Sequence, residues 1–135
     1  MKKWILKGIL LCLLFVMSAC SVITKESPKV RDLEFVVEGE EVIPEHLKEI
    51  IEEKKEEDFQ LTYSDGKDLY IAIGYGRQES SGYQVVVSEL YLTEEAIHVD
   101  TTLLGPKPDA EGKNTPSYPY IVIKMELLDL PVVYK

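Results

Sequence analysis

The chain has 135 residues, of which 45% are hydrophobic, and its formal net charge at pH 7 is −9. This length is sufficient for one domain with a single hydrophobic core. The acidic balance repels phosphate backbones, so it argues against a protein that binds nucleic acid.

The first residues have the pattern of an export signal. Met1-Lys2-Lys3 and Lys7 make a basic start, and the run from Gly8 to Met17 carries no charge. A helix over that run would rise only about 15 Å, against roughly 30 Å of membrane hydrocarbon. A cleaved signal peptide is therefore favoured over a permanent transmembrane helix.

Small residues directly precede a cysteine at the end of this apolar run. Met17-Ser18-Ala19-Cys20 resembles the lipobox of bacterial lipoproteins, in which the cysteine is acylated and becomes the new N-terminus. The resemblance implies removal of residues 1–19, diacylglycerol and palmitate chains on Cys20, and a lipid-anchored position on the extracytoplasmic face of the cell membrane. Cys12 lies in the removed part, so the mature chain can form no internal disulfide. The alternative is a soluble secreted protein with an incidental cysteine.

The rest of the chain divides into a tether and one domain. The removed part holds three lysines and no acidic residue, so the remaining 116 residues have a formal net charge of −12. Residues 20–30 are short, polar and contain a proline, which is typical of a tether. Residues 31–135 are predicted to form a single domain, with the acidic surface serving solubility.

The domain is predicted to begin with a strand and a helix. Residues 33–38 have the composition of a strand, and Pro44 suits the first turn of a helix. Leu47, Ile50 and Ile51 follow at helical spacing and make one narrow apolar stripe. We interpret this stripe as packing on a sheet, and a partner-binding helix is the alternative.

Strands dominate the remainder of the sequence. Asp65-Gly66 between two alternating apolar runs predicts a β-hairpin. The Gly- and Pro-containing stretches 74–82 and 105–117 predict loops. Gly82 can take a positive φ at the entry to the next strand, and Thr93-Glu94-Glu95 is predicted to turn the chain. The fold class is therefore α+β, with one helix packed on a mostly antiparallel sheet or small β-sandwich of five to six strands. The predicted strands after the helix are 59–63, 69–73, 83–92, 96–103 and 118–125, with a short edge piece at 130–134.

Residue types suited to catalysis are sparse. His46 and His98 are the only histidines, and His98 shares a strand face with Asp100 at spacing two. Such a pair is structural far more often than catalytic. The sequence has no zinc-ligand spacing, EF-hand loop or Walker pattern. We therefore expect a noncatalytic protein without a metal ion or cofactor.

The stretch IGYGRQESSGYQVVV, residues 73–87, opens a resemblance to a known family. The pattern is similar to the C-terminal domain of the PrcB family of protease-complex subunits, and it spans about residues 69–125. It departs from the family at Ser81, where a glycine is usual. The resemblance implies an accessory role beside a protease of the cell envelope. It is carried by Gly76, Ser80-Ser81-Gly82-Tyr83, the strand at 96–103, the loop with Pro106 and Pro108, and Tyr118-Pro119-Tyr120.

The loops 76–83 and 105–118 are the predicted surface for an envelope protein partner. Tyrosine and arginine are enriched at the hot spots of protein interfaces. The alternative is that these tyrosines simply pack the strand ends. The predicted partner-binding residues are Tyr75, Arg77, Ser81, Gly82, Tyr83, Tyr118 and Tyr120.

A second resemblance supplies an alternative function. Ser81-Gly82-Tyr83 is similar to the Thr-Gly-Tyr loop that chagasin-type inhibitors of cysteine proteases present on an immunoglobulin-like sandwich. Their Arg-Pro-Trp loop is missing, and the only tryptophan, Trp4, lies in the predicted signal. Inhibition of a protease is therefore the alternative to an accessory subunit.

Overall fold

The computed structural model describes residues 27–109 and 114–135. Cys20 and the predicted signal peptide lie outside the described residues, so cleavage and acylation stay predictions. In the part that is described, no helix has the length and apolar character needed to cross a membrane.

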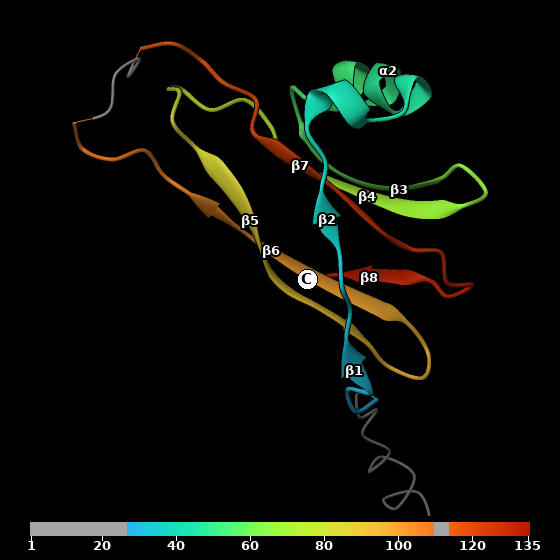
Figure 1. The fold of residues 1–135 in the computed structure, drawn as a ribbon. Helices are drawn as coiled ribbons and strands as arrows, with labels where there is room; N and C mark the ends of the chain where they lie inside the picture. Colours follow the sequence, from blue (N-terminus) through green and yellow to red (C-terminus); the bar gives the residue numbers. More distant parts are fainter. Residues whose placement is uncertain (1–26, 110–113) are drawn as a thin grey trace, which may run out of the picture.

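The described chain contains one α-helix, one short 3₁₀ helix and eight strands (Figure 1). In chain order they are β1 (Arg31–Asp32), β2 (Val36–Val37), η2 (Glu40–Val42), α2 (Glu45–Lys54), β3 (Asp58–Ser64), β4 (Asp68–Tyr75), β5 (Gln84–Leu92), β6 (Ile97–Leu104), β7 (Tyr120–Glu126) and β8 (Val132–Tyr134).

The strands form two four-stranded sheets. The first sheet has the order β1-β5-β6-β8, and the second sheet has the order β2-β7-β4-β3. Only β6 and β8 pair in parallel, and the other named pairs are antiparallel. The predicted α+β class is confirmed, but the predicted number of five to six strands is wrong, because the N-terminal segment and the C-terminal piece contribute short strands of their own.

The molecule has three layers, with β4 buried on both faces. Leu69, Ile71 and Ile73 of β4 belong to the core that the two sheets enclose. Tyr70 and Ala72, which alternate with them, belong to a second core beneath α2. The helix therefore covers the outer face of the second sheet, and the first sheet covers its inner face (Figure 1).

The helix buries two of the three residues in the stripe that the sequence predicts, while Ile50 is half-buried. Leu47 is fully buried and Ile51 is 2% exposed, and both pack in the core beneath α2. Pro44 occupies the N-cap position, where its carbonyl oxygen accepts a hydrogen bond from the Lys48 amide at 3.0 Å. The stripe thus packs on a sheet, as we interpret it from the spacing.

Of the predicted strand at 33–38 only Val36–Val37 is a strand, because this part of the chain crosses from one sheet to the other. β1 pairs with β5 of the first sheet, and β2 pairs with β7 of the second sheet. Leu33 is buried between them, and its amide donates to the Leu90 carbonyl at 3.0 Å. The Glu38 amide then donates to the Val122 carbonyl at 2.9 Å. Apolar composition indicates extended backbone, but it does not specify which sheet supplies the partner strand.

The predicted β-hairpin around Asp65-Gly66 is confirmed and is longer than expected. Its strands β3 and β4 pair from Asp58↔Tyr75 to Ser64↔Leu69 without a register shift. The Asp65 carboxylate accepts hydrogen bonds from the amides of Lys67 and Asp68 at 2.9 and 2.8 Å, and these bonds lower the pKa of Asp65. Gly74, which the sequence places at the start of a loop, lies within β4.

Candidate functional site

The two predicted partner-binding loops meet in space. The Gln78 amide donates to the Ser117 carbonyl at 2.8 Å, and the Ser117 amide donates back to the Gln78 carbonyl at 3.1 Å. The Ser117 hydroxyl also donates to the Ser80 carbonyl at 2.6 Å. The segments leading into β5 and β7 therefore form one joined surface at the end of the sandwich (Figure 1).

Three of the predicted residues line one hollow beside these joined loops. Tyr83, Tyr118 and Tyr120 border a hollow of about 430 Å³, and Val85 and Ile121 contribute apolar lining. The segment from β2 to η2 borders the same hollow from the other side. Tyrosine combines a large apolar ring with a polar hydroxyl, so a group of tyrosines beside apolar residues is suited to contact a protein surface.

Two of these tyrosines are held by charged neighbours. The Tyr120 hydroxyl donates to Glu40 Oε1 at 3.4 Å, and burial together with the Glu40 charge raises the pKa of Tyr120. The Tyr118 ring centroid lies 5.3 Å from the Lys55 ammonium at the end of α2, which is a cation–π distance. Tyr120 therefore remains a neutral hydrogen-bond donor at ordinary pH.

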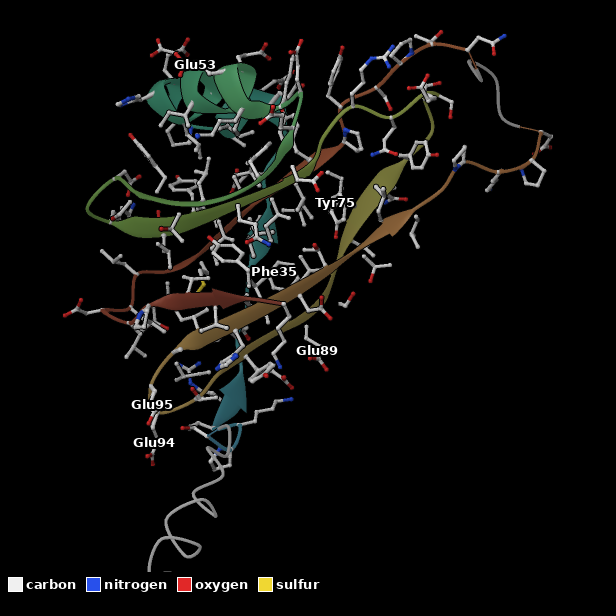
Figure 2. All side chains as sticks on the ribbon, turned by 180° about the vertical axis from the view of Figure 1, so that it is seen from behind. Phe35, Glu53, Tyr75, Glu89, Glu94 and Glu95 are labelled. Carbon is white, nitrogen blue, oxygen red and sulfur yellow. The ribbon has the colours of Figure 1, made fainter. Side chains whose placement is uncertain are left out.

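Tyr75 and Arg77 do not line this hollow with the other residues. Tyr75, labelled in Figure 2, is half-buried against the core between the sheets. Its hydroxyl lies 2.6 Å from the Thr101 hydroxyl of β6. Tyr75 thus fits the alternative in which a tyrosine packs a strand end. The Arg77 guanidinium pairs with Glu79 at 2.8 Å, and the Arg77 amide donates to the Glu56 carbonyl.

Gly82 adopts the backbone conformation that the sequence predicts for it. Its φ is +92°, in the left-handed region that favours glycine, directly before Tyr83 and the start of β5. Ser81, its half-buried neighbour, belongs to the same turn. The turn therefore sets the direction in which Tyr83 leaves the loop.

The contact between Gln78 and Ser117 could not be predicted from the sequence. Besides the two backbone hydrogen bonds, the Gln78 side-chain amide donates to the Tyr75 carbonyl at 3.0 Å. Polar residues inside loops carry no periodicity, so no pattern indicates a partner that is 39 positions away. The loops could be named from composition, but their contact could not.

The histidine that the sequence pairs with Asp100 has a different neighbour. His98 Nε2 lies 3.4 Å from the Thr93 hydroxyl, and the imidazole ring stacks on Tyr91 at 4.8 Å between centroids. The Thr93 hydroxyl also accepts from the Ala96 amide at 3.1 Å, so it is engaged in the turn before β6. Across residues 27–109 and 114–135, no group of three or more His, Cys, Asp or Glu side chains is placed to hold a metal ion.

The joined loops lie inside a segment that matches the model of a protein family. Residues 69–126 match the model of a protein family described as PrcB C-terminal. Comparison with curated proteins and with solved structures found no match. The matched segment runs from β4 to the end of β7, and it includes Gln78, Ser117 and all seven predicted partner-binding residues. The resemblance seen in the sequence is confirmed, and residues 69–126 of this chain carry the pattern of the PrcB C-terminal family.

Proposed function

We propose that this chain is an extracytoplasmic lipoprotein, anchored through an acylated Cys20, whose noncatalytic domain binds another envelope protein. The family match over residues 69–126 points to an accessory domain associated with a protease complex. The partner we propose is therefore a subunit of such a complex in the cell envelope.

The observation that carries this proposal is the pair of joined loops with three tyrosines on one hollow. The hollow combines apolar lining from Val85 and Ile121 with the phenol groups of Tyr83, Tyr118 and Tyr120. Interfaces concentrate their binding energy in such clusters, where a partner side chain fills a pocket and excludes water. No covalent chemistry is required of these residues.

The charged residues around the hollow limit the kinds of partner side chain that could bind there. Glu38 and Glu40 border the same hollow as the tyrosines. The Glu38 carboxylate is paired with Lys124 at 3.3 Å, whereas the Glu40 carboxylate accepts a hydrogen bond from the Tyr120 hydroxyl at 3.4 Å. We propose that the partner inserts an apolar or basic side chain, because an acidic one would face Glu40.

A partner-capture experiment tests the proposed surface. The tagged full chain is crosslinked in the native envelope, and the captured proteins are compared with those of Tyr83→Ala/Tyr118→Ala. We expect the double variant to lose at least about tenfold of the captured partner, because two contacts of the hollow are removed. Tyr91→Ala, on the outer face of the first sheet, is the matched control and should capture the partner normally.

The outcomes of this experiment are distinct. Equal capture by the double variant and the wild-type chain would show that the tyrosine hollow is not the contact surface. Equal thermal unfolding of the two variants excludes loss of the fold as the cause. The anchor is tested separately, since incorporation of labelled palmitate should disappear in Cys20→Ala.

A further inference from the structure

The edges of the two sheets differ sharply in length. β1 and β2 have two residues each and β8 has three, whereas β3 has seven and pairs with β4 along its whole length. Within the described chain, no strand pairs with the outer side of β3, which is the last strand of its sheet. A long regular edge presents unpaired backbone groups to any second strand, and proteins usually blunt it.

The side chains of β3 do not protect this edge. The strand reads Asp58-Phe59-Gln60-Leu61-Thr62-Tyr63-Ser64, with no lysine, arginine or proline and with Asp58 as its only charge. Lysine, proline, bulges and short length are the devices that normally prevent pairing between edges, and β3 has none of them.

β3 is chemically complementary to itself. When two copies are aligned antiparallel about Leu61, Phe59 faces Tyr63 and Gln60 faces Thr62. Asp58 then faces Ser64, so no two like charges stand opposite each other. Opposed like charges destabilise strand pairs, whereas aromatic and uncharged polar pairs stabilise them. We propose that β3 pairs with β3 of a second copy of this chain, which gives a two-fold dimer with one continuous eight-stranded sheet.

The inner face of β3 has room for this second strand. Gln60 and Thr62 point to the same side of the sheet as Ile73 and Ile71, which are in the core. Both Gln60 and Thr62 are nevertheless exposed, so the first sheet stops short of β3. Asp58 and Gln60 border a hollow of about 310 Å³ whose opposite side includes Thr101 and Lys135, so open space separates this face of β3 from the first sheet.

The outer face places part of the acidic surface of the helix away from this edge. Glu45, Glu49, Glu52 and Glu53 border a hollow that also contains Tyr120 of β7, two strands away from β3. On the β3 side the helix presents His46, whose ring centroid lies 6.0 Å from that of Tyr63. Glu45 and Glu52 thus lie on the helix flank away from β3, whereas Glu53, seven positions after His46, shares the face of the helix that carries His46.

The symmetry of this dimer agrees with the proposed membrane anchor. This agreement depends on that part of the proposed function. The two-fold axis runs perpendicular to the sheet, so both copies of α2 lie on one face of the dimer. β1, which follows the tether, lies at the end of the molecule away from α2 (Figure 1). Both tethers then leave toward one membrane, and confinement there raises the effective concentration of each copy for the other.

A charge-swap experiment tests the dimer. The full chain is expressed with two different tags, and co-capture of the two tagged forms is measured from detergent-solubilised membranes. In Gln60→Lys/Thr62→Lys, and likewise in Gln60→Glu/Thr62→Glu, like charges face each other across the proposed pairs. We expect each variant alone to lose at least about tenfold of its self-capture, and a mixture of the two to recover it.

The control and the contrary outcomes are clear. Glu94→Lys/Glu95→Lys changes charge at the remote turn after β5 and should leave self-capture intact (Figure 2). Absence of wild-type self-capture would overturn the proposal, as would unchanged self-capture in the lysine variant. The proposal would also be overturned if the mixture did not recover self-capture, because residues 60 and 62 of the two copies would then not face each other. Capture of the envelope partner by the lysine variant is a separate readout, so the tyrosine hollow and the β3 dimer can fail independently.

Discussion

At the scale of single residues, position 74 requires a glycine, because there is no space for a side chain there. It faces Phe59 across the β3–β4 pair, and the Phe59 ring covers the place that a Cβ atom at position 74 would occupy. Phe59 is itself buried beneath α2. Glycine is depleted in strands, which is why the sequence places a loop at Gly74, whereas the ring makes glycine necessary there.

Gly74→Ala should therefore destabilise the domain through a clash with the Phe59 ring. We expect a loss of about 1–3 kcal/mol in the free energy of unfolding, the usual cost of overpacking a core. Urea denaturation followed by circular dichroism measures this change. Phe59→Leu removes the ring, so Gly74→Ala should lower the free energy of unfolding by less in that background. Strictly additive effects of the two substitutions would contradict the proposed clash.

At the scale of elements, the β5–β6 hairpin depends on one buried hydroxyl. Thr93 is 2% exposed, and its amide donates to the Ala96 carbonyl at 2.9 Å. Its hydroxyl accepts from the amides of Glu95 and Ala96 at 3.4 and 3.1 Å. The turn at residues 93–95 was readable from its polar composition, but the burial of Thr93 depends on how the hairpin packs.

Thr93→Val should leave the Ala96 amide without its side-chain acceptor. The expected loss is about 1–3 kcal/mol, the cost of an unpaired polar group in a buried position. Thr93→Ser keeps the hydroxyl and should lose clearly less. Equal urea midpoints for the valine and serine variants would show that the hydroxyl does not hold this turn.

At the scale of the whole molecule, the two sheets are joined at both ends of the described chain. Leu33 crosses from the first sheet to the second on one side. On the other side, β8 adds Tyr134 to the core between the sheets. The Tyr134 hydroxyl is buried and has no hydrogen-bond partner in the described residues, and burial raises the pKa of Tyr134 to about 12.

This raised pKa predicts a loss of stability at alkaline pH. The unfolded chain releases the Tyr134 proton near pH 10, before the folded chain does, so the free energy of unfolding should fall between about pH 10 and about pH 12. Tyr134→Phe should reduce this slope, while Tyr70 and Tyr120, whose pKa values are also raised by burial, keep part of it. Urea unfolding at about pH 8 and about pH 11 measures the slope. An unchanged slope in the phenylalanine variant would contradict this assignment.

The sequence by itself determined the features that depend on neighbouring residues. The stripe of Leu47 and Ile51 follows helical spacing, and Asp65-Gly66 specifies a tight turn. Gly82 has the positive φ expected at a strand entry. The family pattern was also readable over the segment that matches, residues 69–126. Each of these signals is carried within a few positions of the chain, where backbone sterics and periodicity act directly.

Only the tertiary structure decided which distant segments share a surface. It divided residues 31–37 between two sheets, turned Tyr75 toward Thr101, and joined the loops through Gln78 and Ser117. Among the described residues, it also left β3 as the one long open edge. Strand partners and side-chain directions depend on how two sheets and a helix bury their apolar faces together, and that packing is a property of residues far apart in the sequence.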